Sequence, residues 1–420
     1  MPNNLSSNIT QKVARVFLAE AESARVLTKT IDTQLFAGEF TPEFGSTISV
    51  KRPHDYTALR TAAGDISSST KSDIISGKAS ATVQNYITVA TEWTNKEEAL
   101  DLDQLAEILR PAATRAVTEL ELSLGRFMIS NVGLRYGSLG TVVDAWTDVA
   151  GAQALMDSTG VPMDERYYVM NPYTAMNLAS AQTGIRNEQL VKTAWERSQI
   201  SMPFGGMKAM ASNALATFTT GANADLAGAL AANPDVTYAT AKDTMTQSLS
   251  VSGFGANAVI TAGSIVTIAG RHRVNLSTKQ TVLDSTGARV VWSAVVTSTV
   301  TLSGAGAGTI VVAGPAIFEA TGAYNTVDSA PVSGDVVTVL GTASTLYQPN
   351  LFFHKQAFTM ATVKLPKLYN TDTVATTKDG ISIRVSKYSD GDKNQQKIRF
   401  DILPAFGCMN PLYAGQGYGV

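Results

Sequence analysis

The sequence predicts an α+β protein into which an all-β domain, a barrel or a sandwich, is inserted. Residues 103–131 have helical apolar spacing, and residues 144–212 alternate between helical and strand patterns. From 213 to 344 the composition changes: Thr, Ser, Val, Ala and Gly dominate, and short apolar runs end in glycine turns. Short strands at this spacing are typical of a β-barrel or sandwich. The α+β pattern returns after Tyr347, so one α+β domain is interrupted by a β domain.

The composition limits the classes of protein that need to be considered. The chain has 420 residues, enough for two or three domains, and a net charge of −2, which predicts no general attraction to nucleic acid or acidic membranes. Only 16% of residues are charged, against roughly 25% in typical soluble domains, so we expect neighbouring subunits to cover much surface. A single cysteine, Cys408, excludes a disulfide framework. No signal peptide or membrane span is recognisable, which predicts a cytoplasmic protein.

The first part of the chain predicts a helix and a long loop. Residues 11–31 have helical spacing, which fits either an ordinary packed helix or an arm that docks on a neighbour. Two stretches then alternate as strands do, STISVKRP at 46–53 and ATVQNYITVA at 81–90. The polar segment between them predicts a long exposed loop, and such loops are usually functional or disordered.

Residues 103–131 give the strongest helical signal. Their apolar residues step by three or four positions and are Leu105, Leu109, Ala113, Ala116, Leu120, Leu124 and Phe127. Pro111 either kinks this helix or restarts it at a first-turn position. At about 1.5 Å per residue the helix is about 40 Å long, which suits the spine of an extended domain.

The remaining elements follow from local pattern. Helices are predicted at 144–158, 171–182 and 187–199, and strands at 166–170 and 205–212. Strands in the inserted region are predicted in the runs QSLSVSG, SIVTIAG, RVVWSAVVTSTVTLSG, TIVVAG and GDVVTVLG. Near the end, ISIRVSKY and QKIRFDILPAFGCM predict a long hairpin.

No motif supports catalysis, a cofactor or a metal. The three histidines are far apart in the sequence, and SGAGAGT lacks the Lys-Ser/Thr of a phosphate loop. Asp390, Asp392, Asn394 and Asp401 have calcium-loop spacing, but Gln395 stands where that loop needs glycine. A plain hairpin turn is therefore favoured over a calcium site.

A local basic cluster, GRHRVN at 270–275, leaves two interpretations open. In a strand, Arg271 and Arg273 would share a face. That face is either solvated or in contact with an acidic loop of a neighbouring subunit.

The order of these elements resembles that of the major capsid proteins of tailed phages, whose fold was first seen in phage Hong Kong 97. It is more closely similar to the coat proteins of short-tailed Salmonella and Shigella phages, which carry an inserted β-barrel. The motifs that match are individually weak but occur in order over nearly the whole chain: MPNNLSSNITQ, ISGKASATVQNYITVA, LDQLAEILRPAATRAVTELELSLGRFM, QLVKTAWERSQISMPFGGMKAMASNALA, TIAGRHRVNLSTKQ, QPNLFFHKQAF, VKLPKLYN and SIRVSKYSDGDKNQQKIRFDILPAFGCMNP.

The resemblance implies a division of the chain into parts. These are an N-terminal arm at 1–35, an extended loop at 36–93, the spine helix of a peripheral domain at 94–135, an axial domain at 136–217, an inserted β-barrel at 218–345, and a return to the axial and peripheral domains at 346–420. The match is poorest at 218–235, where the insertion begins.

The resemblance also implies a function. Many copies, as pentamers and hexamers, would form an icosahedral shell around double-stranded DNA, in the virion, after assembly in the bacterial cytoplasm with a scaffolding protein and a portal protein. No cofactor, sequence-specific DNA contact or membrane is implied. The candidate subunit contacts are Arg60, Asp65, Lys71, Asp73, Lys78, Arg271 and Arg273.

Alternatives from other classes stay open at this point. An encapsulin-like compartment would share the fold but lack the inserted barrel and the portal. An extracellular β-rich adhesin or surface-layer protein fits the Thr/Gly-rich region but needs a secretion signal. A soluble enzyme lacks any recognisable site.

Overall fold

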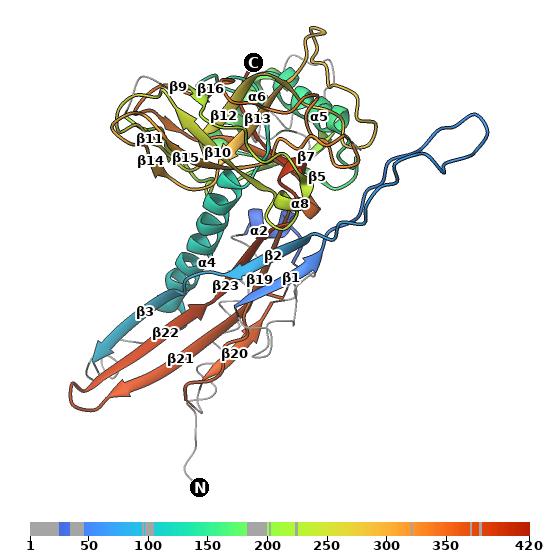
Figure 1. Ribbon diagram of the computed structural model, residues 1–420. Coiled ribbons are helices and arrows are strands. Elements are labelled where there is room, and N and C mark those ends of the chain that lie inside the picture. The colour runs from blue at the N-terminus through green and yellow to red at the C-terminus, as the bar shows by residue number, and fades with distance from the viewer. Residues whose placement is uncertain are drawn as a thin grey trace. The chain divides into compact units, whose positions relative to one another are not determined.

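The structure is a computed structural model that describes residues 25–33, 46–94, 96, 105–182, 200, 203–222, 226–320, 322–369, 372–377 and 380–420. The chain forms two compact units. Unit 1 comprises 1–49, 80–125 and 358–407, and unit 2 comprises 50–79, 126–357 and 408–420. Figure 1 labels the helices and strands of both. Within the described ranges, no helix combines the length and apolar composition that a membrane crossing needs.

Unit 1 combines two four-stranded sheets with helical segments. The sheet orders are β1-β2-β23-β19 and β20-β21-β22-β3. Its elements are α2 (Leu27–Thr30), β1 (Thr47–Lys51), β2 (Lys78–Val83), β3 (Ile87–Thr94), α4 (Leu105–Ser130), β19 (Phe358–Thr362), β20 (Thr373–Thr376), β21 (Ser382–Asp390), β22 (Gln395–Ile402) and β23 (Pro404–Cys408). The ends of β1, β2, α4 and β23 pass into unit 2.

The spine helix α4 confirms the predicted helix and most of its apolar stripe. Ala113, Ala116, Leu120 and Leu124 are all buried, and Pro111 lies inside the helix. One acidic residue on this helix is also buried. Glu121 accepts hydrogen bonds from the backbone N–H groups of Leu27 and Thr28, at 2.6 and 3.0 Å, and so satisfies free donors at the start of α2. The rest of the helix predicted at 11–31 lies mostly outside the described residues, as does the helix predicted at 187–199.

The predicted C-terminal hairpin is confirmed, with a correction to its second strand. Strands β21 and β22 pair antiparallel, with Arg384 opposite Asp401 at one end and Asp390 opposite Gln395 at the other. The run predicted as one second strand is two, because β22 ends at Ile402 and β23 begins at Pro404 in the other sheet. The same correction applies to ATVQNYITVA, which divides between β2 and β3, again in different sheets.

Unit 2 contains an α+β part built on one mixed six-stranded sheet. The order is β4-β24-β18-β5-β7-β6. Its elements are β4 (Leu134–Tyr136), α5 (Trp146–Thr159), β5 (Arg166–Met170), α6 (Pro172–Gln182), β6 (Pro203–Phe204), β7 (Met207–Ala211), β18 (Asn350–His354), the 3-10 turns η1 (Lys355–Ala357) and η2 (Pro411–Tyr413), and β24 (Ala414–Gly417). Every residue of β5 and β18 is buried, as expected for central strands. Residues of α5 and α6, including Met156 and Leu178, pack with the sheet in one core.

The other part of unit 2 is a closed antiparallel barrel of order β10-β15-β13-β12-β16-β9. The elements of this region are β8 (Phe218–Thr219), β9 (Ala227–Leu230), α8 (Tyr238–Ala241), β10 (Thr246–Ser252), β11 (Val259–Ile260), β12 (Ile265–His272), β13 (Val291–Val296), β14 (Val300–Thr301), β15 (Gly308–Ala313), β16 (Val336–Leu340) and β17 (Leu346–Tyr347). The predicted β region is therefore a barrel and not a sandwich.

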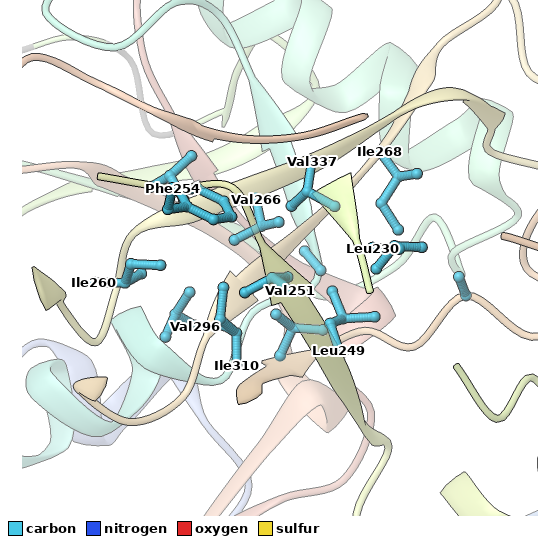
Figure 2. Close-up of a cluster of buried hydrophobic side chains, with 14 of the residues drawn as sticks. Leu230, Leu249, Val251, Phe254, Ile260, Val266, Ile268, Val296, Ile310 and Val337 are labelled. Carbon is cyan, nitrogen blue, oxygen red and sulfur yellow. The ribbon is translucent and has the colours of Figure 1, made fainter. Parts of the chain in front are cut away.

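The barrel has its own apolar core. Figure 2 shows side chains such as Leu249, Phe254 and Ile310 converging on its interior, where Trp292 is also fully buried. Strands β8 and β17 pair with each other where the chain leaves and re-enters the α+β part. This pairing brings the two ends of the inserted segment together.

Candidate functional site: the root of the extended loop

The extended loop, defined here as residues 52–77, connects the neighbouring strands β1 and β2. In Figure 1 it is the blue hairpin that projects from its unit. Of residues 56–74, only Ser69 and Ser72 are partly shielded from solvent, and the rest are exposed. The hydrogen bonds described there join residues of the loop to one another, such as those from the Ser67 N–H to Asp65 Oδ1 at 2.8 Å and from the Thr57 N–H to Ser72 Oγ at 2.9 Å. The loop therefore has no core of its own.

The root of this loop, by contrast, is firmly held. Arg52 is 7% exposed, and its Nε donates to the Lys78 carbonyl oxygen at 3.2 Å. Its Nη1 donates to the carbonyl oxygen of Met409, near the end of the chain. The Arg52 N–H also donates to the Gly77 carbonyl oxygen at 2.9 Å. One guanidinium thus ties the two ends of the loop to each other and to the C-terminal segment.

Burial changes the ionisation of groups at the root. Desolvation lowers the pKa of Arg52, although nearby Cys408, Tyr238 and Asp243 act against this shift. Burial raises the pKa of Cys408 to about 12, so this residue is a neutral thiol at physiological pH. The guanidinium of Arg52 makes its charge-assisted hydrogen bonds to carbonyl oxygens, those of Lys78 and Met409, and the nearby Asp243 carboxylate favours its charged form.

Residues of the inserted barrel region also contact the root. Asp55 donates its backbone N–H to Tyr324 Oη at 3.1 Å, and its carboxylate pairs with Lys279 Nζ at 3.3 Å. The Lys78 N–H donates to Asp243 Oδ1 at 3.2 Å. These three contacts join both strands of the loop stem to the inserted region.

Apolar packing completes the root. Tyr238 and Tyr324 stack with ring centroids 3.7 Å apart, and Ile75 of the loop packs against the cluster they belong to. Gly77 passes so close that a Cβ there would lie 2.6 Å from the Lys242 carbonyl oxygen. Only glycine permits this approach without displacement of backbone. The root is therefore closely packed, whereas residues 56–74 are almost all exposed.

The structure places five of the predicted contact residues on or next to the loop. Arg60, Asp65, Lys71, Asp73 and Lys78 are all exposed. The backbone N–H of Ser67 lowers the pKa of Asp65 and so favours its charged form. These five residues stay candidates for contacts between subunits.

The two predicted contact residues in the basic cluster behave differently from the expectation of a shared exposed face. Pairing of β12 with β13 shifts register between Thr267 and His272, and Gly270 has φ +75°, so the alternation of side chains is broken. Arg271 forms a bidentate ion pair with Asp335, with Nε–Oδ2 and Nη2–Oδ1 distances of 2.8 and 2.9 Å.

Arg273 is only 2% exposed, and it donates to the carbonyl oxygens of Gly133 and Ser293. Both guanidinium groups are thus engaged within their own subunit, Arg273 almost completely buried and Arg271 partly exposed, and a contact of either with a neighbouring subunit stays a proposal.

Sequence reasoning missed the residues that form the root. Asp55, Tyr238 and Tyr324 belong to no motif, and Lys279 lies in the run TIAGRHRVNLSTKQ, which gave it no role. Asp55 is more than 220 positions from both Lys279 and Tyr324, and Tyr238 of α8 stacks on Tyr324 of a separate segment. The glycine in the run ISGKAS at 75–80 was the one local signal, because a glycine inside a strand pattern indicates a close backbone approach. In the described part of the chain, no group of His, Cys, Asp and Glu side chains is arranged to hold a metal ion.

Comparisons with known proteins give consistent matches. The family model described as P22 coat protein, gene protein 5, matches residues 1–419. A protein of Acyrthosiphon pisum secondary endosymbiont phage 1, named major capsid protein, is 40% identical over 425 aligned positions that cover 100% of both chains.

Solved structures are similar at low sequence identity. A chain of Mycobacterium phage Che8 matches with TM-score 0.47 and 11% identity, over 93% of this chain and 90% of that one. A capsid chain of Cyanophage P-SCSP1u matches with TM-score 0.46 and 9% identity, over 94% and 88%.

Of the functions that the sequence left open, the family match selects one. A capsid protein needs surfaces that join copies of one chain and needs no catalytic site, which agrees with the exposed loop and its closely packed root. The chain therefore belongs to the P22 coat protein family and is a phage major capsid protein, a structural component of the virion that assembles with copies of itself and is not an enzyme.

Proposed function

We propose that copies of this chain, as pentamers and hexamers, form an icosahedral head around double-stranded DNA, which they contact without sequence specificity. Assembly takes place in the host cytoplasm, with a scaffolding protein and with a portal protein at one vertex. The phage belongs to the short-tailed Salmonella/Shigella group. The sequence motifs described above support this finer assignment, and the near-neutral charge suits a container from which DNA must later leave.

The observation that carries the assembly proposal is the contrast between the closely packed root and the exposed body of the extended loop. Four large apolar side chains on the loop are exposed: Tyr56, Leu59, Ile66 and Ile74. Exposed apolar groups on a projecting segment are typical of protein contact surfaces. A neighbouring subunit would also satisfy backbone groups that the loop does not pair internally.

In this proposal the inserted barrel region has a positioning role. The contacts of Asp55, Lys78 and Ile75 fix the direction in which the loop leaves its subunit. A fixed direction lowers the entropy lost when the loop binds a neighbour. The division into the arm, loop, spine, axial and inserted domains, with the boundaries given above, is part of the same proposal.

The test is removal of residues 62–73 from the loop. The shortened chain should remain a folded monomer, because the deleted residues are exposed, but it should fail to form closed shells or form fragile ones. Circular dichroism and thermal melting report on the monomer, and sedimentation with electron microscopy reports on the shells.

A matched control replaces the same twelve positions with a Gly-Ser segment of equal length, which preserves reach but removes the side chains. Assembly by this control would show that reach and backbone suffice, and that Asp65, Lys71 and Asp73 are not contacts. Normal shells from the deletion itself would contradict the proposed role of the loop, and an unfolded monomer would show that the loop belongs to the subunit core.

A further inference from the structure

A cavity of about 370 Å³ lies within unit 2, between the loop hairpin 283–291 and the segment formed by β4 and α5. Its volume is in the range of small-molecule sites. The lining residues that matter here are Arg135, Tyr136, Ser158, Asp284, Arg289 and Ser293. The shell-forming role of the chain accounts for none of them.

The cavity has a cationic wall. Arg135 is half-buried, and among the described residues its guanidinium has no hydrogen-bond or ion-pair partner. Burial lowers the pKa of Arg135, and the attraction of Tyr418 opposes this shift only in part. Arg289, at 63% side-chain exposure, is 3.9 Å from Asp328, which already binds His272 at 2.9 Å. Both guanidinium groups therefore retain donors for a ligand.

A third cation lies directly behind this wall. Arg273 is buried and donates to the carbonyl oxygen of Ser293, a lining residue, at 2.6 Å. Within the described residues Arg273 has no carboxylate partner, and burial lowers its pKa to about 10, so it is still charged at neutral pH. In a low-dielectric surrounding its field reaches the cavity with little screening.

The acidic residue in the lining compensates only weakly. Asp284 uses Oδ1 to accept from the Thr286 N–H at 2.8 Å, the Thr286 hydroxyl at 2.6 Å and the Ala288 N–H at 2.9 Å. These bonds hold the turn of the hairpin, and the carboxylate is exposed to solvent, which screens its charge. The lining and the residue behind it thus hold three arginines and one carboxylate, Asp284; Asp328 lies outside the lining, binds His272, and is 3.9 Å from Arg289.

We propose that this cavity binds a phosphate-type oxyanion. Arg135 is the principal ligand, since a guanidinium matches the geometry of phosphate and donates two parallel hydrogen bonds to it. Arg289 lies at the exposed side and binds a second oxygen, while Ser293 supplies a further polar group; the Ser158 hydroxyl donates to the Ala154 carbonyl oxygen at 2.7 Å and only lines the cavity. The concave shape favours a small phosphate compound over the backbone of a DNA duplex.

The experiment measures binding of inorganic phosphate to the full-length unassembled subunit by calorimetric titration at constant ionic strength. Saturable binding is expected. Arg135→Gln should weaken it at least about tenfold, the loss expected for a charge-assisted hydrogen bond. Arg289→Gln should weaken it severalfold. Arg115→Gln is the matched control, since Arg115 is an exposed arginine on α4 that pairs with Glu119, and it should leave binding unchanged.

Absence of saturable binding, or equal binding by Arg135→Gln, overturns the proposal. If the Arg135→Gln variant does not fold, the Arg289→Gln variant is the test. Phosphate binding equal to that of the unmodified protein, in calorimetry and in broadening of the phosphorus NMR line, would then overturn the proposal. A short DNA duplex is titrated in parallel. Arg135-dependent binding of the duplex without binding of inorganic phosphate would mean that the cavity recognises nucleic acid and would overturn the small-molecule site.

Discussion

The barrel and the extended loop belong to the same compact unit, yet they are stabilised in opposite ways. The barrel closes its sheet, so no strand edge is left open, and it buries its own apolar core around Trp292. The loop buries almost nothing, and only Ile75 near its root joins an apolar cluster. The difference indicates that the barrel is stabilised by its own buried core, whereas the extended loop is held mainly by the contacts at its root.

The most direct test of this contrast is to separate the barrel from the rest of the chain. A fragment of residues 215–345 should fold alone, because it contains all six barrel strands and strand β8 of the β8–β17 pair. A dispersed amide NMR spectrum and cooperative melting are expected. A collapsed fragment without cooperative melting would show that the barrel depends on the α+β part.

The largest effect of a single substitution should come from the barrel core. Trp292→Ala should lower the free energy of unfolding by about 3–5 kcal/mol, because it removes a fully buried side chain and leaves a cavity. Denaturant unfolding monitored by circular dichroism measures this loss. Trp146→Ala is the matched control: Trp146 is 57% exposed on α5, and a change within about 0.5 kcal/mol is expected there.

A pH experiment extends the comparison to charges. The hydrogen bonds from Arg271 lower the pKa of Asp335, with burial acting against this shift. A carboxyl whose folded-state pKa is depressed contributes stability above its unfolded pKa of about 3.9 and loses it as the pH falls through the folded value. Asp335→Asn should cost about 1.5–3 kcal/mol at pH 7 and make the fall in stability below about pH 4 shallower.

Asp65 of the loop provides the contrasting case. Its pKa is also lowered, by the Ser67 N–H, but the residue is fully exposed and far from any core. Asp65→Asn should leave the melting temperature unchanged at every pH tested. A shift comparable with that of Asp335→Asn would mean that the loop is coupled to the subunit core.

The root should show an intermediate and local effect. Tyr324→Phe removes the hydroxyl that accepts the Asp55 N–H but keeps the ring stacked on Tyr238. A loss of about 1 kcal/mol is expected in the local stability of the loop stem. Hydrogen exchange of residues 52–56 should accelerate about fivefold, with little change in global melting. Unchanged exchange there would argue against a positioning role of the barrel region.

The smallest effect is expected on the loop itself. Tyr56→Ala removes a side chain that is 56% exposed, so monomer stability should change by no more than about 0.5 kcal/mol. Assembly rate, followed by light scattering, is the informative measurement. A slower rate at unchanged monomer stability would support a contact with a neighbouring subunit, and no change in either would remove Tyr56 from the contact surface.

The local pattern of the sequence was sufficient for the type of most elements. Helix α4 was predicted from apolar residues spaced three or four positions apart, and strand β5 from the apolar run RYYVM. The β21–β22 hairpin was predicted from two stretches of alternating residues around SDGDKNQ. These signals are reliable because burial on one face imposes a fixed period on neighbouring residues. The same reasoning failed at Gln84 and Leu403, where an alternating run continues while the chain passes from one sheet to the other.

Only the tertiary structure decided which side chains act together. Arg271 and Arg273 look alike in the sequence, but one pairs with Asp335 and the other is buried against the Gly133 and Ser293 carbonyl oxygens. The root of the loop depends on partners as distant as Arg52 and Met409, 357 positions apart. Periodicity reports whether a residue is buried within its own element, whereas the identity of its partner depends on how distant elements pack, and no local pattern encodes that.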